Sequence, residues 1–191
     1  MTQAKISAET KYVRDALLAF AVNAKMNQIV LDQLDPAAWN AKLSGSRTRT
    51  IAAILAHVHN IRCKWIRLSA PHLKLPPTLD RACTQQQART SLKKSDARCR
   101  EMIEEALNSP PERGPQFIRD GWARPWPAGV MMVAYMITHE AHHRGQICML
   151  AHQLGYPLSG STTSTMWNWE RIQKQCTVVR EPLSQKAQRK A

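Results

Sequence analysis

The nine residues THEAHHRGQ, at positions 138–146, carry three histidines, a glutamate, an arginine and a glutamine. They follow the apolar run VMMVAYMI at 130–137, so these imidazoles belong to a segment with the composition of a buried helix. In a helix, His139 and His143 stand four residues apart on one face, which is a common arrangement for two metal ligands. The same side chains would also suit a hydrogen-bonded polar network, and the pattern alone leaves both interpretations open.

A metal site that keeps a position for water or substrate usually has a third protein ligand. In the helix predicted for residues 50–68, His57 lies on the flank of an apolar face, and we expect it to reach the core. His59 points nearly the opposite way, over an alanine-rich face with Cys63, which indicates helix packing or a dimer surface. His59 is nevertheless kept as the alternative to His57 for the third ligand. The other candidates from the sequence are His72, His142 and His152.

Hydrophobic periodicity predicts the helices that must position these residues, at about 8–34, 50–68, 84–107 and 127–154. Thr50 is the expected N-cap of the second helix. Thr84 and Gln87 have the spacing of a capping box at the start of the third. Pro127 suits the first turn of the fourth helix, and Gly155 suits its C-terminal stop.

The remaining segments complete the predicted architecture. Residues 112–127 could form a short strand pair or an irregular loop, and residues 166–175 could form one short helix. Four long helices joined by loops predict an all-α, four-helix up-and-down bundle with a short C-terminal helix. We expect this bundle to span residues 1–176 and to be followed by a basic, flexible tail at 177–191.

Composition limits the class of protein. The 191 residues carry a net charge of +13, but the basic residues are dispersed, so we expect at most non-specific contact with nucleic acid. No apolar run reaches membrane-spanning length, and the N-terminus has no secretory pattern, so we expect no membrane association and a cytoplasmic location. Five widely spaced cysteines without a CxxC pair predict reduced thiols.

Two stretches carry a resemblance to a known family. TIAAILAHVHNIRCKWI (50–66) and HEAHHRGQICMLAHQLG (139–155), with NAKMNQIVLDQL (23–34) and MWNWE (166–170), resemble the DinB-like (YfiT-like) family of the DinB/YfiT-like superfamily. The resemblance implies a four-helix bundle with an unusual connection order that is commonly a homodimer. It also implies a divalent metal held by His57, His139 and His143.

Three neutral imidazoles suit zinc, nickel or iron better than magnesium or calcium. We expect a divalent cation, zinc first, with nickel, iron or manganese as alternatives. Characterised members of the superfamily that this chain resembles include transferases and isomerases that use low-molecular-weight thiols. The resemblance therefore favours an enzyme that activates a thiol for S-transfer to a small electrophilic substrate. A metal-dependent hydrolase and a non-catalytic metal-binding stress-response protein are the alternatives.

Residues beside the histidines could orient the ligand imidazoles or could serve only the packing and solvation of the bundle. The candidates are His142, Gln146 and Glu140, and the helical wheel places the first two better than Glu140. Arg144 is expected to form a salt bridge or to meet an anionic substrate. Gly145 indicates the close approach of another helix. Four tryptophans could wall a pocket or cover the core: Trp122, Trp126, Trp167 and Trp169.

Overall fold

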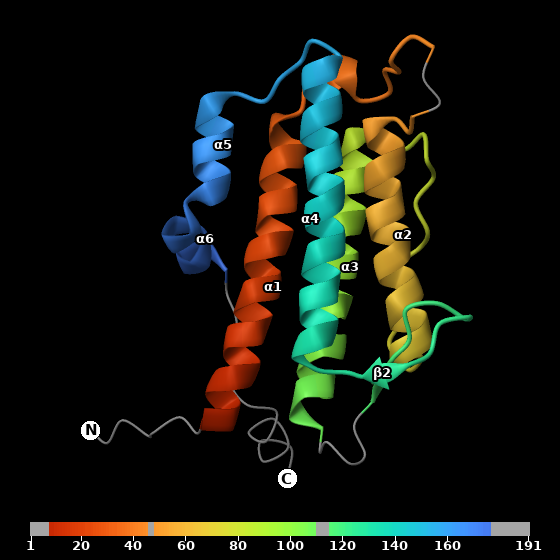
Figure 1. Cartoon of the computed structure of the whole chain (residues 1–191), viewed down its shortest axis with the longest axis vertical. Helices are drawn as coiled ribbons and strands as arrows, with labels where there is room; N and C mark the ends of the chain where they lie inside the picture. Colours follow the sequence, from red (N-terminus) through yellow and green to blue (C-terminus); the bar gives the residue numbers. More distant parts are fainter. Residues whose placement is uncertain (1–7, 46–47, 110–114, 177–191) are drawn as a thin grey trace.

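The computed structural model describes residues 8–45, 48–109 and 115–176, and it is an all-α bundle built on four long helices (Figure 1). A 3-10 turn at Pro36–Ala38 and a two-stranded antiparallel pair, β1 (Gln116–Phe117) and β2 (Trp126–Pro127), lie in the connections. The helices are α1 (Ala8–Gln33), α2 (Ile51–Ser69), α3 (Gln85–Asn108), α4 (Val130–Gln153), α5 (Gly160–Trp167) and α6 (Trp169–Gln175).

The four long helices do not alternate in direction. The segment 70–84 returns along α2: the Pro77 carbonyl oxygen lies 2.9 Å from His59 Nε2, and Cys83 Sγ lies 3.9 Å from the Ala52 carbonyl oxygen. Because this segment ends beside the start of α2, α3 runs parallel to α2, and α1 runs parallel to α4 (Figure 1). The simple up-and-down order is therefore wrong, whereas the unusual connection order implied by the resemblance is observed.

The helix ends follow local capping chemistry at three of the four predicted positions. The Thr50 side chain accepts a hydrogen bond from Ala53 N at 3.1 Å. Thr84 and Gln87 form the expected capping box, with distances of 3.1 and 2.8 Å. Gly155 adopts φ 87° just after α4, a conformation that glycine reaches without steric cost.

Two local predictions are wrong. Pro127 does not begin a helix, because it pairs with Gln116 in the strand pair, and α4 begins only at Val130. Residues 166–175 do not form one helix. Asn168 leaves the helical conformation at ψ 71° and its side chain accepts from Arg171 N, so α5 ends and α6 begins there.

The core has two large apolar layers with a polar layer between them, and a small apolar cluster of Val22, Met26 and Ile172 joins α1 to α6. One apolar layer gathers residues from the end of α1, the start of α2 and the end of α4, such as Leu31, Ile51 and Ile147. The other gathers residues from the opposite end, such as Trp65 and Met136. Each long helix therefore crosses from one apolar layer to the other through buried polar positions. These are Asn23, Asn27, His59, Arg62, Ser95, Glu140 and His143.

Other expectations have mixed outcomes in the structure. The described residues contain five free cysteines, in agreement with the predicted reduced thiols. No helix among the described residues is long and apolar enough to cross a membrane. The predicted basic tail, 177–191, lies outside the described residues.

Gly145 lies on the exposed side of α4, and the expected close approach of another helix is not found. A Cβ atom added at Gly145 would meet no atom of the described chain within 4 Å. Since glycine inside a helix costs about 1 kcal/mol relative to alanine, we expect Gly145→Ala to raise the free energy of unfolding by up to about that amount. Urea denaturation measures the change. A loss of stability would instead show that a second chain packs closely on this face.

Candidate metal centre

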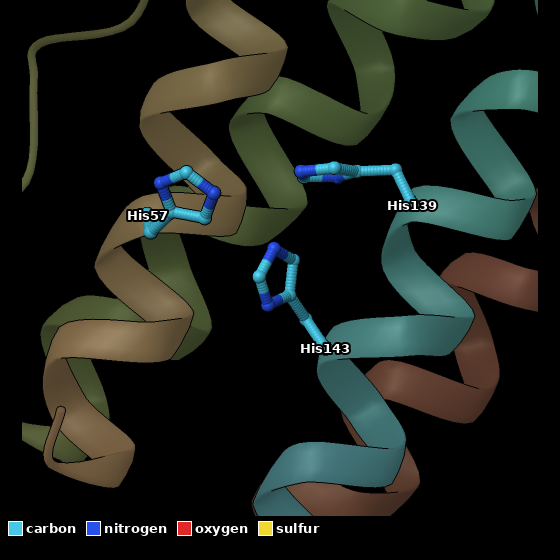
Figure 2. A group of neighbouring side chains, drawn as sticks. All are labelled: His57, His139 and His143. Atoms are coloured by element: carbon cyan, nitrogen blue, oxygen red, sulfur yellow. The ribbon is translucent and has the colours of Figure 1, made fainter. Parts of the chain in front are cut away.

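Three histidines from two helices meet between α2 and α4. The candidate ligand nitrogens of His57, His139 and His143 all lie within 4.8 Å of one another. Figure 2 shows the three rings directed toward a common space, with His57 on α2 and the other two one turn apart on α4. The ring centroids are separated by 4.6 to 5.5 Å. This group could bind a metal ion.

Burial keeps these imidazoles neutral. Desolvation, followed by the charges of neighbouring groups, lowers the pKa of His57 and of His139 from 6.5 to about 4. The pKa of His143 is lowered too, again chiefly by burial. A metal ligand must be the neutral form of histidine, so all three side chains are in the required state near pH 7.

A glutamine fixes the orientation of one ring. His143 Nδ1 lies 2.7 Å from Gln146 Oε1, which can only accept, so we assign the proton of His143 to Nδ1. Its Nε2 is then left with a lone pair. Gln146 Nε2 in turn donates to His142 Nε2 at 3.0 Å. Gln146 therefore contacts His143 directly, and the hydrogen bond of His142 goes to Gln146.

His139 has a nitrogen without a protein partner. Its Nδ1 is buried and has no hydrogen bond from any described residue, while the ring stands edge-on to Trp65 at 5.1 Å between centroids. A buried polar atom without a partner costs free energy in a folded protein and calls for an explanation. An ion coordinated by this group would supply one, so the donor set fits a divalent cation.

Glu140 lies almost completely buried at the centre of the bundle, so of its two predicted roles, orienting an imidazole or packing and solvating the bundle, solvation does not apply. The side chain pairs with Arg62 in a bidentate arrangement, at 2.6 and 2.7 Å. Asn23 and Asn27 each donate to its Oε2 at 2.7 Å. The hydrogen-bonding partners of the carboxylate are thus an arginine and two asparagines of the neighbouring helices, not the ligand imidazoles.

Arg144 completes this network. Its Nη1 donates to the side-chain oxygens of Asn23 at 2.9 Å and Asn27 at 2.7 Å. Arg144 is not among the residues that line the cavity beside the histidines. Two amide contacts are found in place of the expected salt bridge or substrate contact. Arg62, Asn23 and Asn27 were not predicted as part of the site. Arg62 lies on the same helical face as the apolar residues Val58 and Trp65. A charged residue on an apolar face could have indicated a buried ion pair.

The remaining histidines lie away from the group. His59 is fully buried, with its Nε2 2.9 Å from the Pro77 carbonyl oxygen and 3.6 Å from Cys63 Sγ. It therefore packs against the segment after α2, and the interpretation as a dimer surface is wrong. His72 is exposed beside Glu105, and His152 is exposed near the end of α4.

A cavity of about 840 Å³ reaches the group on the side of His143. Ile54, Met149 and Leu150 form its apolar wall. The four tryptophans do not line it; Trp122 and Trp167 are largely exposed, and Trp126 packs on Phe117. The cavity residues are Thr48, Arg49, Ile54, His142, His143, Gly145, Gln146, Met149, Leu150 and Gln153.

Removal of the Glu140 charge tests the buried network. Glu140→Gln leaves the buried Arg62 guanidinium without its hydrogen-bonded counter-charge, and we expect the free energy of unfolding to fall by about 3–5 kcal/mol. Glu170→Gln is the matched control, because it breaks the exposed Glu170–Lys174 pair and should cost less than about 1 kcal/mol. Equal losses in urea denaturation would contradict the account.

The lowered pKa values of His57 and His139 predict how stability changes with pH in the metal-free protein. Below about pH 6.5 the unfolded chain binds protons at these residues, whereas the folded chain binds them only near pH 4. We therefore expect stability to fall as pH drops from about 6.5 to about 4. Urea unfolding at several pH values measures the slope. The double variant His57→Asn, His139→Asn should lose less stability over this range, and an unchanged slope would contradict the prediction.

Comparison with known proteins adds one match. The model of the DinB family matches residues 8–175, which includes all three histidines and every helix described above. Comparison with curated proteins and with solved structures gave no match.

Proposed function

Because this chain belongs to the DinB family, we propose that it is a metal-dependent enzyme that transfers the sulfur of a small thiol to an electrophile. His57, His139 and His143 would hold the divalent cation. The observation that carries the proposal is the meeting of three neutral imidazoles within 4.8 Å beside an open cavity.

The donor set supports zinc as the cation. Three imidazoles form a common protein ligand set of catalytic zinc, which keeps a further position for a small molecule. Nickel, iron and manganese are the alternatives, because imidazole also binds the other transition metals. When bound, such a cation lowers the pKa of a thiol or of water at the free position.

The residues around the cation would keep its ligands in place. Gln146 fixes the His143 ring through a 2.7 Å hydrogen bond, and partners of this kind raise metal affinity by holding the imidazole in one orientation. Ile54, Met149 and Leu150 make one wall of the cavity apolar, so a bound small molecule is partly shielded from water.

The reacting thiol would come from a co-substrate. Burial raises the pKa of Cys63 to about 11, and burial likewise raises the pKa of Cys148 and Cys99. These side chains stay protonated near pH 7 and are poor nucleophiles. The pKa of a small-molecule thiol that enters the cavity is not raised by burial in the bundle.

The test is conjugation of L-cysteine or glutathione to 1-chloro-2,4-dinitrobenzene by zinc-loaded protein. The S–C bond forms, chloride leaves and the thiol proton passes to buffer, so the coloured thioether reports the rate. We expect turnover by the wild type and background rates for His57→Ala and His143→Ala. His152→Ala is the matched control, because His152 is exposed on the same helix.

Absence of conjugation by wild type would contradict the thiol proposal. Hydrolysis of 4-nitrophenyl acetate without thiol, lost in His143→Ala, would then assign a metal-dependent hydrolase. Binding of zinc with neither reaction would assign a non-catalytic metal-binding protein.

A further inference from the structure

The cavity beside the histidines carries one charged side chain that the proposed function does not use. From it we infer that the substrate or co-substrate thiol bears a carboxylate, which Arg49 recognises. The inference rests on the proposed function, because it names the chemical class of the molecule that enters the same site.

Among the described residues that line the cavity, the charge is positive and has no counter-charge. Arg49 is the only arginine or lysine of these described residues, and none of them is an aspartate or glutamate. The other described lining groups are uncharged or are the imidazoles of His142 and His143, of which His143 belongs to the three-histidine group. A divalent cation held by uncharged ligands would add further positive charge, so an anionic molecule gains electrostatic attraction from both sides.

Arg49 has no carboxylate partner within the described part of the chain. Its side chain forms no ion pair there, although seven other lysine or arginine side chains of the described chain do. Arg49 is exposed in the segment that leads into α2, which places it where a molecule would enter. A guanidinium in this state is available for a ligand.

The charge of Arg49 reaches the histidines. It contributes to the lowered pKa of both His57 and His143, after desolvation and other neighbours. Arg49 and His143 also line the same cavity, so one small molecule in it could meet both Arg49 and the metal position. Thiol and carboxylate would stand at its two ends, with the intervening carbons against Ile54 and Met149.

A carboxylate suits the Arg49 position better than a phosphate does. The planar guanidinium forms two parallel hydrogen bonds with a carboxylate, and such pairs are stronger than those between neutral groups. A single arginine suits a single carboxylate, whereas phosphate sites in proteins gather several donors or a helix N-terminus. The start of α2 is already capped by Thr50, so its first amides are not all available.

The alternative explanation is an ordinary exposed arginine in a strongly basic chain. The chain has 27 lysines and arginines, so exposure and charge alone would not single out Arg49. What distinguishes it is its place in the lining of the cavity that reaches His143. Arg124 is also exposed, but it lies in the connection between β1 and β2 and does not line the cavity, which makes it a matched control.

The experiment uses full-length protein loaded with cobalt(II), whose visible and near-ultraviolet absorption changes when a thiolate binds. The probes are 3-mercaptopropionate and 3-mercapto-1-propanol, which have nearly the same size and differ in charge. We expect wild type to bind the acid about tenfold more tightly than the alcohol. Arg49→Gln should remove most of this preference, Arg49→Lys should retain part of it, and Arg124→Gln should leave it unchanged.

The outcomes separate the two proposals. If both thiols bind and the ratio of their dissociation constants is the same in wild type and Arg49→Gln, the assignment of Arg49 is wrong and the thiol function stands. A preference for the acid that survives in Arg49→Gln would reflect chelation of cobalt by the carboxylate, and it too overturns the assignment. If neither thiol changes the cobalt spectrum, the thiol function fails, and the inference fails with it.

Discussion

The buried ion pair between Arg62 and Glu140 is the constraint on which the rest of the bundle depends. Both side chains are almost completely buried, so each charge needs the other to offset the loss of water. Asn23 and Asn27 satisfy the remaining capacity of the carboxylate, and Arg144 satisfies the oxygens of these amides. Arg62 Nη1 also donates to the Leu92 carbonyl oxygen of α3 at 3.1 Å, so the network ties all four long helices together. The Arg62–Glu140 pair sets the register in which α2 and α4 pack, because a shift of either helix by one turn would leave both charges unpaired.

This register determines where the histidines meet. His139 directly precedes Glu140, and His57 lies little more than one turn before Arg62, so the pair that joins α2 to α4 also brings their imidazoles to within 4.8 Å of one another. Burial lowers the pKa of His57 and His139 to about 4, which keeps these rings neutral near pH 7. At the His143 side the cavity opens, so the group combines partial burial with access for a small molecule.

Features encoded within a few residues were predictable from the sequence, and features that need distant partners were not. The caps at Thr50 and Thr84 and the stop at Gly155 are local, and they were confirmed. Helical spacing placed His139 and His143 on one face, and the family resemblance implied His57 as the third member of the group that the structure brings together. The helical wheel gave Glu140 no partner, because a wheel of α4 contains no information about Arg62, which is 78 residues away. The parallel course of α2 and α3 likewise depends on contacts that segment 70–84 makes with α2.

The measurement that tests the central claim most directly is the metal content of untagged protein, determined by mass spectrometry after incubation with zinc and removal of the excess. The account predicts about one ion per chain in the wild type and its loss in His57→Ala and in His143→Ala. His152→Ala, altered on the exposed side of α4, should retain the ion. A wild-type protein that holds no zinc, or that holds it equally well without His57 and His143, would contradict the account and leave the three imidazoles as a polar part of the core.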